Sequence, residues 1–274
     1  MRSFLRLLPP ALILVAGFAA GASAQRLDYQ PPETKGMEIE DHSGQTIPED
    51  LEFTDEDGRT VRIGDYLEDG KPLVLQMVYF ECPMLCNLVL NGFVEGAKGI
   101  QWTPGKEYRV VTVSFDPKDT PEAAQAKKAN YVESLGRPDA AEGWHFLVGD
   151  KDRVRALADA VGFPYRYLKD RDQFAHSAGI FVIDPEGRIS RTLYGIEFKP
   201  QDLRFSLMEA SKGRLGTPLQ KLVLFCFHYD ASRNAYGLVA INVMKIGGLV
   251  TVAAVGTLMA VLWYRERHRR PKVV

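Results

Sequence analysis

An apolar run that leads into two cysteines constrains the fold of this 274-residue chain more than any other feature. Residues 73–80 (LVLQMVYF) are typical of a buried central strand, and residues 85–100 follow with the apolar spacing of a helix. Cys82 and Cys86 lie at this strand-to-helix junction. Side chains four residues apart share one face of a helix, so both sulfurs can approach one point. The pair can therefore hold one soft metal ion or form one disulfide.

The order of the other predicted elements indicates an α/β domain. Short runs of β-branched and aromatic residues alternate with longer helical patterns. Two helix starts carry capping residues, Thr120 ahead of a proline and Asp150 ahead of a charged helix. Because the cysteines follow the first core strand, this order predicts a thioredoxin-like fold. The further elements we expect are strand 108–115, helix 120–135, strand 145–148, helix 151–161, a hairpin of 178–183 and 189–194, and helix 200–211.

Both ends of the chain carry signals for export and membrane insertion. Residues 1–24 combine two arginines, an apolar stretch and a small-residue cleavage site, which predicts a removed signal peptide; an uncleaved anchor is the alternative. Residues 246–264 are uncharged and long enough to cross a hydrocarbon layer of about 30 Å. The predicted organisation is signal peptide 1–24, extended lead-in 25–50, thioredoxin-like domain 51–212, membrane-proximal segment 213–245, transmembrane helix 246–264 and basic tail 265–274.

The charge distribution predicts on which side of the membrane each part lies. The arginine-rich tail after the apolar helix predicts a cytoplasmic C-terminus, so the domain lies outside the cytoplasm, in a periplasm or its equivalent. Disulfides are permitted in such a compartment. The formal net charge is −1 with mixed signs, which gives no indication of a nucleic-acid surface. The chain has three cysteines, of which Cys226 is the odd one.

His176 is the best candidate for a third metal ligand. Thiolates select copper(I) or zinc, and two sulfurs leave room for an imidazole. His176 directly precedes a strand of the expected hairpin, and in a thioredoxin-like fold the loop at that position lies beside the cysteine helix. The competing interpretation is a structural disulfide between Cys82 and Cys86, with His176 as a loop histidine whose hydrogen bonds are satisfied within the fold.

Four segments make the chain resemble the Sco/SenC family of copper-binding proteins, which assist cytochrome c oxidase assembly. The resemblance implies that Cys82, Cys86 and His176 ligate copper, and that the partner is the copper-bearing oxidase subunit or another copper or thiol protein. The chain departs from the family pattern where Met84 replaces an acidic residue and Asn87 replaces a proline, so it resembles a divergent branch. The matching segments are Cys82-Pro-Met-Leu-Cys86, Val113-Ser-Phe-Asp-Pro-Lys-Asp-Thr-Pro121, Trp144-His-Phe-Leu147 and His176-Ser-Ala-Gly-Ile-Phe-Val-Ile-Asp-Pro-Glu-Gly187.

Four other residues near these motifs give weaker signals. Met84 supplies a thioether that suits copper(I), but we favour a packing role for it. Asp116 and Asp119 match the family pattern, although locally they indicate a turn and a helix entry. We expect His145 to be a strand-edge residue rather than a ligand.

A second group of polar residues lies in the membrane-proximal segment. If residues 222–230 are extended, Cys226, His228 and Asp230 point to one side, because side chains alternate along a strand. One interpretation is a second soft-metal site, or a thiol that exchanges with the main pair. We favour the other, a membrane-proximal strand with a free cysteine.

Two functions of different kinds fit these residues. The first is a membrane-anchored copper chaperone that passes copper(I) to an oxidase subunit. The second is an enzyme, a thiol-disulfide oxidoreductase that keeps a partner's copper-site cysteines reduced, with Cys82 as the provisional nucleophile. The wider C-x-x-x-C spacing and the lack of a proline beside His176 favour metal binding. We discount a thiol peroxidase, because the supporting arginine and hydroxyl residue are not found around Cys82.

Overall fold

The fold is taken from a computed structural model of the chain, which describes residues 36–67, 69–212, 215, 227–230, 235–238 and 240–269. The predicted signal peptide and the first part of the predicted lead-in lie outside these residues. From residue 36 onward the chain approaches the domain along an irregular path, in which Met37 and Ile47 are buried.

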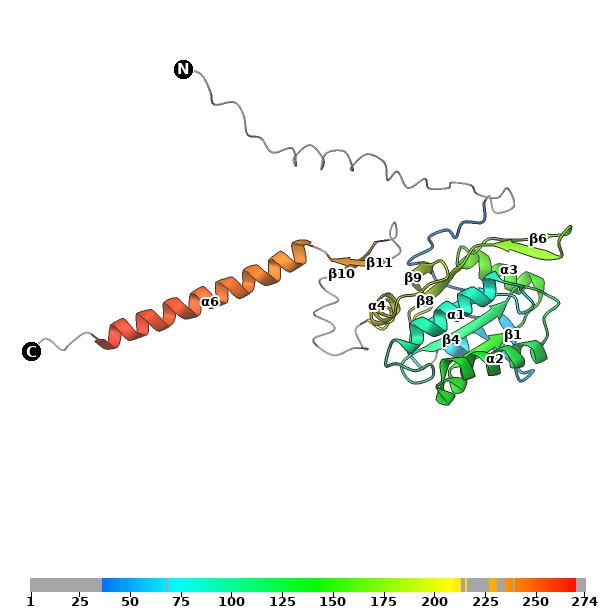
Figure 1. Ribbon diagram of the computed structural model, residues 1–274, viewed down its shortest axis with the longest axis horizontal. Helices are drawn as coiled ribbons and strands as arrows, with labels where there is room; N and C mark the ends of the chain where they lie inside the picture. Colours follow the sequence, from blue (N-terminus) through cyan, green and yellow to red (C-terminus); the bar gives the residue numbers. More distant parts are fainter. Residues whose placement is uncertain are drawn as a thin grey trace, which may run out of the picture. The chain divides into compact units, whose positions relative to one another are not determined.

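A mixed five-stranded sheet forms the centre of the domain (Figure 1). Its spatial order is β5-β4-β3-β8-β9, in which β3, β4 and β5 are parallel, and β8 and β9 are antiparallel to their neighbours. Every side chain of the middle strand β3 is buried, as expected for a strand covered on both faces. The strands are β3 (Leu73–Val78), β4 (Arg109–Ser114), β5 (Trp144–Leu147), β8 (Gly179–Ile183) and β9 (Ile189–Tyr194).

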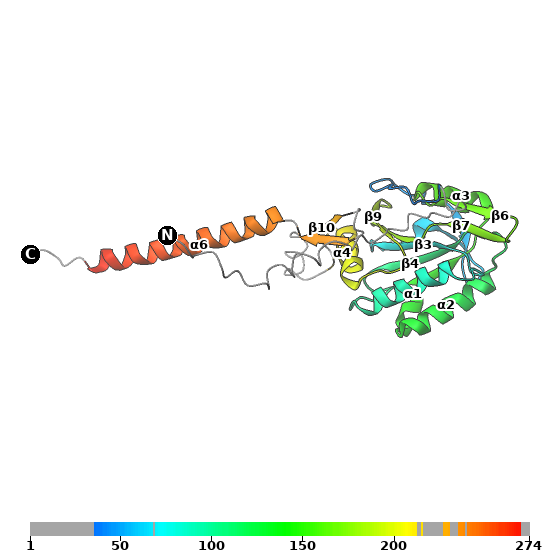
Figure 2. The same ribbon diagram turned by 45° about the horizontal axis from the view of Figure 1, so that its top comes forward.

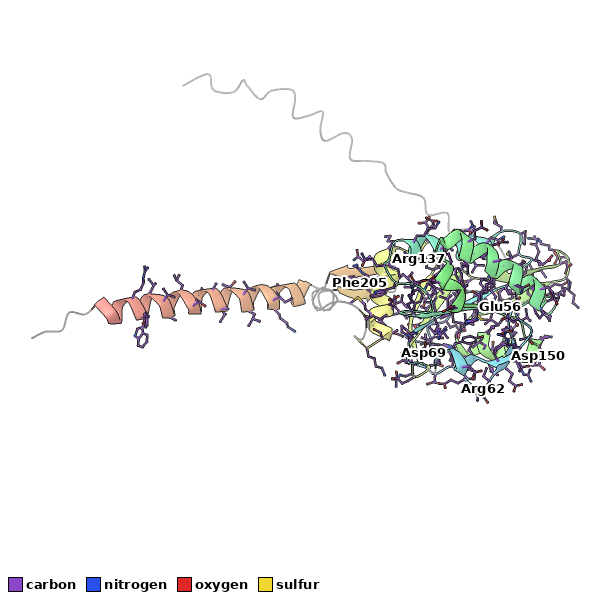
Figure 3. All side chains as sticks on the ribbon, turned by 90° about the horizontal axis from the view of Figure 1, so that it is seen from below. Glu56, Arg62, Asp69, Arg137, Asp150 and Phe205 are labelled. Atoms are coloured by element: carbon purple, nitrogen blue, oxygen red, sulfur yellow. The ribbon has the colours of Figure 1, made fainter. Side chains whose placement is uncertain are left out.

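Helices cover both faces of this sheet. Helices α1 and α2 connect successive parallel strands and pack together on one face, while α3 lies on the other (Figures 1 and 2). Both predicted caps are present: the Thr120 hydroxyl accepts the N–H of Ala123, and the Asp150 carboxylate, labelled in Figure 3, accepts the N–H of Arg153. The helices are α1 (Leu85–Lys98), α2 (Pro121–Leu135), α3 (Lys151–Ala160) and α4 (Pro200–Ala210).

Helix α1 packs very closely against the segment between β9 and α4. A Cβ added at Gly92 would lie 1.8 Å from the carbonyl oxygen of Ile196, and one at Gly96 would lie 2.5 Å from that of Phe198. Only glycine allows this approach, which explains two glycines inside a helix despite a cost of about 1 kcal/mol each relative to alanine. The contact fixes α1, and with it the cysteines at its start.

The predicted strands and helices of the domain agree with the observed ones to within a residue or two at each end. The sequence analysis missed two short antiparallel hairpins and two turns of 3₁₀-helix. Strands of three or four residues contain too little alternation to be recognised from sequence. The missed elements are β1 (Glu52–Thr54) with β2 (Thr60–Arg62), β6 (Tyr165–Leu168) with β7 (Gln173–His176), η3 (Ile63–Tyr66) and η4 (Pro138–Glu142).

The C-terminal part contains one hairpin and one long helix. Strands β10 (Phe227–Asp230) and β11 (Ala235–Leu238) form an antiparallel pair. Residues 227–230 of the segment 222–230 are therefore extended, as predicted, whereas Cys226 lies outside the described residues. Helix α6 (Ala240–Arg269) contains the span Met244–Arg265, which is long and apolar enough to cross a membrane. This span includes the predicted 246–264 helix.

Candidate metal centre

Cys82 and Cys86 are brought together by the turn from β3 into α1. Cys82 lies in the turn, and Cys86 is the second residue of the helix. The Cys86 N–H, which has no partner inside the first helical turn, points to the Cys82 sulfur at 3.3 Å. The Tyr79 N–H lies 3.4 Å from the Cys86 sulfur. Backbone donors therefore orient both sulfurs, and neither cysteine forms a disulfide.

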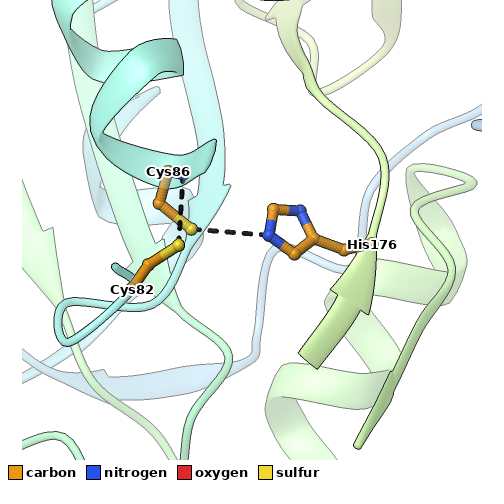
Figure 4. Close-up of side chains that lie close together, drawn as sticks. All are labelled: Cys82, Cys86 and His176. Carbon is orange, nitrogen blue, oxygen red and sulfur yellow. Dashed lines mark hydrogen bonds between the residues drawn. The ribbon is translucent and has the colours of Figure 1, made fainter. Parts of the chain in front are cut away.

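His176 reaches the cysteines from the β6–β7 hairpin (Figure 4). The prediction that it occupies a loop was wrong, because His176 is the last residue of β7. Its Nε2 lies 3.6 Å from the Cys86 sulfur, and its Nδ1 lies 2.7 Å from the carbonyl oxygen of Ser177. A carbonyl oxygen can only accept, so Nδ1 carries the proton. This contact leaves the Nε2 lone pair facing the sulfurs, as in histidines that ligate metals.

The three side chains form one compact group of donors. The two sulfurs and one nitrogen of His176 lie within 4.8 Å of one another, and all three residues are buried. Two thiolates with one imidazole suit copper(I) or zinc, and fit magnesium or calcium poorly. The structure therefore brings together the three residues that the sequence analysis selected as ligands.

The two thiols differ in their electrostatic surroundings. The hydrogen bond from the Cys86 thiol lowers the pKa of Cys82 to about 3, against the effect of burial. Burial raises the pKa of Cys86 well above its usual value, and the Cys82 sulfur raises it further. Cys82 is therefore the more readily ionised of the two cysteines.

Aromatic rings enclose His176. Its ring centre lies 5.1 Å from that of Phe115, 5.8 Å from that of Phe163 and 6.0 Å from that of Tyr79. Burial raises the pKa of the Tyr79 hydroxyl above its usual value, and the Cys82 sulfur raises it further. These rings come from separate segments of the chain, so no local motif could have identified them. They hold the imidazole in place and exclude water from the three donors.

Asp119 fixes the loop ahead of Cys82, a role that the sequence analysis did not identify. Its carboxylate accepts the Phe80 N–H at 2.7 Å and the Ser114 hydroxyl at 2.5 Å. Burial raises the pKa of Asp119, although both hydrogen bonds oppose this effect. The predicted turn is also present, since the Asp119 N–H donates to the carbonyl oxygen of Asp116. Asp119 therefore ties the β4–α2 turn to the end of β3.

The structure also places the weaker candidates from the sequence. The Met84 side chain is 65% exposed, so the packing role that we favoured was wrong. His145 lies on the edge strand β5, as predicted, with its Nδ1 3.1 Å from a carboxylate oxygen of Glu56. His228 lies within strand β10. Cys226 and its proposed exchange with the main pair fall outside the described residues.

Comparison with known proteins gives a consistent set of similarities. A family model described as SCO1/SenC matches residues 40–208, which include all three donors. The SCO1 protein homolog of Bacillus subtilis (strain 168) is 21% identical over 174 residues, which cover 61% of this chain and 83% of that protein.

Solved structures are similar over a comparable share of the chain. A putative electron transfer protein from Aquifex aeolicus VF5 is 25% identical with a TM-score of 0.55, covering 61% of this chain and 94% of its own. BsSco, described as a member of the Sco family of cytochrome c oxidase assembly proteins with a disulfide switch, is 21% identical with a TM-score of 0.50. That match covers 64% of this chain and 98% of the BsSco chain. The predicted thioredoxin-like α/β fold is confirmed.

Proposed function

Since the chain belongs to the SCO1/SenC family, we propose that it is a membrane-anchored, extracytoplasmic copper chaperone. In this proposal copper(I) is the cargo, and Cys82, Cys86 and His176 bind it. The observation that carries the proposal is the group of two sulfurs and one imidazole nitrogen within 4.8 Å. Copper(I) prefers such soft donors, and the orientation of the His176 ring leaves Nε2 free to bind.

Loading would change the protonation of one thiol. The Cys82 thiolate can bind copper(I) directly, whereas Cys86 must lose its proton as the ion binds, because the metal ligand is the thiolate. We propose that the ion leaves by ligand exchange, in which a thiolate of the partner replaces one donor at a time. Oxidation of Cys82 and Cys86 to a disulfide would remove both sulfur ligands and prevent loading.

The proposed acceptor is the copper-bearing subunit of cytochrome c oxidase or another copper or thiol protein at the same membrane. The candidate span Met244–Arg265 supports an anchored arrangement, with the domain outside and residues 265–274 in the cytoplasm. An anchor would keep donor and acceptor in one plane and so raise their effective concentration. We also propose that residues 1–24 are a signal peptide that is removed on export.

A copper(I) titration of the reduced full chain in detergent tests this function, with a chromogenic copper(I) chelator as competitor. We expect one ion per chain. Removal of a residue outside the ligand set lowers metal affinity by about 10–100-fold, and His176→Ala should lower it by more than this. His145→Ala is the matched control, because His145 contacts Glu56 rather than the thiols. Weak binding by the wild-type chain, or equal affinity in His176→Ala, would contradict the proposal.

The difference between the two thiols supports a second candidate, a thiol-disulfide oxidoreductase. The Cys82 thiolate would attack a partner disulfide and release one partner thiolate, and Cys86 would then displace the second and close a Cys82–Cys86 disulfide. An external dithiol must reduce that disulfide before the next cycle. Turnover of a disulfide peptide by the metal-free chain, and its loss in Cys82→Ser, would support this activity. Negligible exchange by the wild-type chain would exclude it.

A further inference from the structure

Asn87 joins the cysteine loop to helix α2. It directly follows Cys86, and its side-chain NH2 group donates to the carbonyl oxygen of Cys82 at 3.1 Å. The half-buried amide of Asn87 therefore fixes the backbone of Cys82, although Asn87 is the chain neighbour of Cys86.

The orientation of the Asn87 amide follows from its other partners. Its oxygen accepts from the Lys127 ammonium at 2.9 Å and from the Tyr131 hydroxyl at 3.3 Å. Lys127 and Tyr131 are four residues apart on α2 and so lie on one face of that helix. The ammonium group can only donate, so the amide oxygen faces α2 and the NH2 group faces Cys82.

Lys127 brings a positive charge to the loop, and no carboxylate of the described residues pairs with it. Among the described residues its contact is with the neutral amide of Asn87, whereas the next residue, Lys128, pairs with Glu56. Copper(I) bound to two thiolates and a neutral imidazole leaves the site with one net negative charge. A half-buried cation beside that site is still reached by solvent and salt, and at low ionic strength it stabilises this charge.

We propose that Asn87 is a positioning residue for Cys82 and that Lys127 is the counter-charge of the copper(I)–dithiolate state. Asn87 keeps the Cys82 sulfur near Cys86, and it also holds the Lys127 ammonium against the cysteine loop. Both contacts depend on the same amide, so a change at residue 87 alters geometry and charge together. The inference deepens the proposed function and rests on it.

Copper(I) affinities of the full chain in detergent test this inference at low and at high ionic strength. We expect Asn87→Asp and Lys127→Met each to weaken binding by about tenfold, the low end of the cost of losing a residue outside the ligand set. Asn91→Asp is the matched control, because it adds the same charge to an exposed position one turn further along α1. Lys127→Arg should restore the affinity, because it keeps the positive charge.

Ionic strength separates a charge effect from a merely structural one. Because salt screens charges, the loss of copper(I) affinity in Lys127→Met should shrink in 1 M salt, where the screening length falls to about 3 Å. The wild-type chain, measured at the same salt concentration, is the reference. If Asn87→Asp and Lys127→Met bind like Asn91→Asp, or if the Lys127→Met deficit does not change with salt, the inference is overturned. A wild-type chain that binds no copper(I) would instead overturn the proposed function itself.

Discussion

The domain contains two histidine clusters with opposite partners. His145, on the edge strand β5, contacts the buried carboxylate of Glu56, which also accepts from the Lys128 ammonium and from the Phe146 N–H. No carboxylate contacts His176 among the residues that the structure describes; its partners are the Cys86 sulfur and the carbonyl oxygen of Ser177. In the first cluster the charges of Glu56 and Lys128 neutralise each other, whereas the second cluster brings together three possible metal donors.

This difference shows that the neighbours of a histidine, rather than its burial, indicate its role. In the His145 cluster the Glu56 carboxylate accepts from every strong donor around it, so removing this carboxylate would leave those donors unpaired. In the His176 cluster two sulfurs and a nitrogen lone pair face one another, which is favourable only when a proton or a soft cation lies between them. Variants in the His145 cluster should therefore change the unfolding free energy, whereas variants in the His176 cluster should also change the copper(I) affinity.

The largest expected effect comes from the ring at the centre of the His176 cluster. Phe115 is buried and packs against Tyr79, Phe174 and His176. Phe115→Ala should cost about 3–5 kcal/mol of unfolding free energy, the usual cost for a buried phenylalanine, measured by urea denaturation. Phe93→Ala is the matched control, because Phe93 is buried against Trp144 instead.

The milder pair Phe115→Leu and Phe93→Leu then allows copper(I) binding to be compared in folded protein. Only Phe115→Leu should lower the affinity, because only Phe115 contacts the imidazole. Equal affinities in the two leucine variants would mean that the aromatic rings stabilise the domain without positioning His176.

An intermediate effect is expected in the His145 cluster, and it depends on pH. Burial opposes ionisation of Glu56, but hydrogen bonds from His145, Lys128 and the Phe146 N–H prevail and lower its pKa to about 2. A lowered pKa stabilises the fold above the unfolded value of 4.5, and this stabilisation is lost as the pH falls from 4.5 towards 2.

Glu56→Gln should therefore lower the unfolding free energy at pH 7 by on the order of 2 kcal/mol, the cost of losing hydrogen bonds to a charged group. The difference from the wild type should shrink as the pH approaches 2, as followed by denaturant unfolding at several pH values. Glu133→Gln, at an exposed position on α2, is the control. A pH-independent difference would show that the charge of Glu56 is not what stabilises the fold.

The smallest effect is expected at the exposed thioether of Met84. Met84→Leu keeps an apolar side chain of similar size, and exposed substitutions usually change stability by less than about 0.5 kcal/mol, or about twofold in an equilibrium constant. We expect the copper(I) affinity to stay within the same range, because the three donors already lie within 4.8 Å of one another. A larger loss of affinity would assign a ligand role to the Met84 sulfur.

The sequence by itself determined the order of the main strands and helices, the position of Cys82 and Cys86, and the apolar C-terminal helix. These features depend on residues close together in the chain. Alternation and helical spacing operate over one or two turns, and the caps at Thr120 and Asp150 act on backbone N–H groups two or three residues away. The selection of His176 depended on the family resemblance and on its place before a strand.

Only the tertiary structure decided how these residues meet. His176 lies 90 positions after Cys86 in the chain, Asp119 lies 39 after Phe80, and Lys127 lies 40 after Asn87. Each contact depends on how helices and hairpins pack around the sheet, which local periodicity does not specify. For the same reason the sequence could not show that Met84 is exposed, or that His176 ends a strand with its Nε2 towards the thiols.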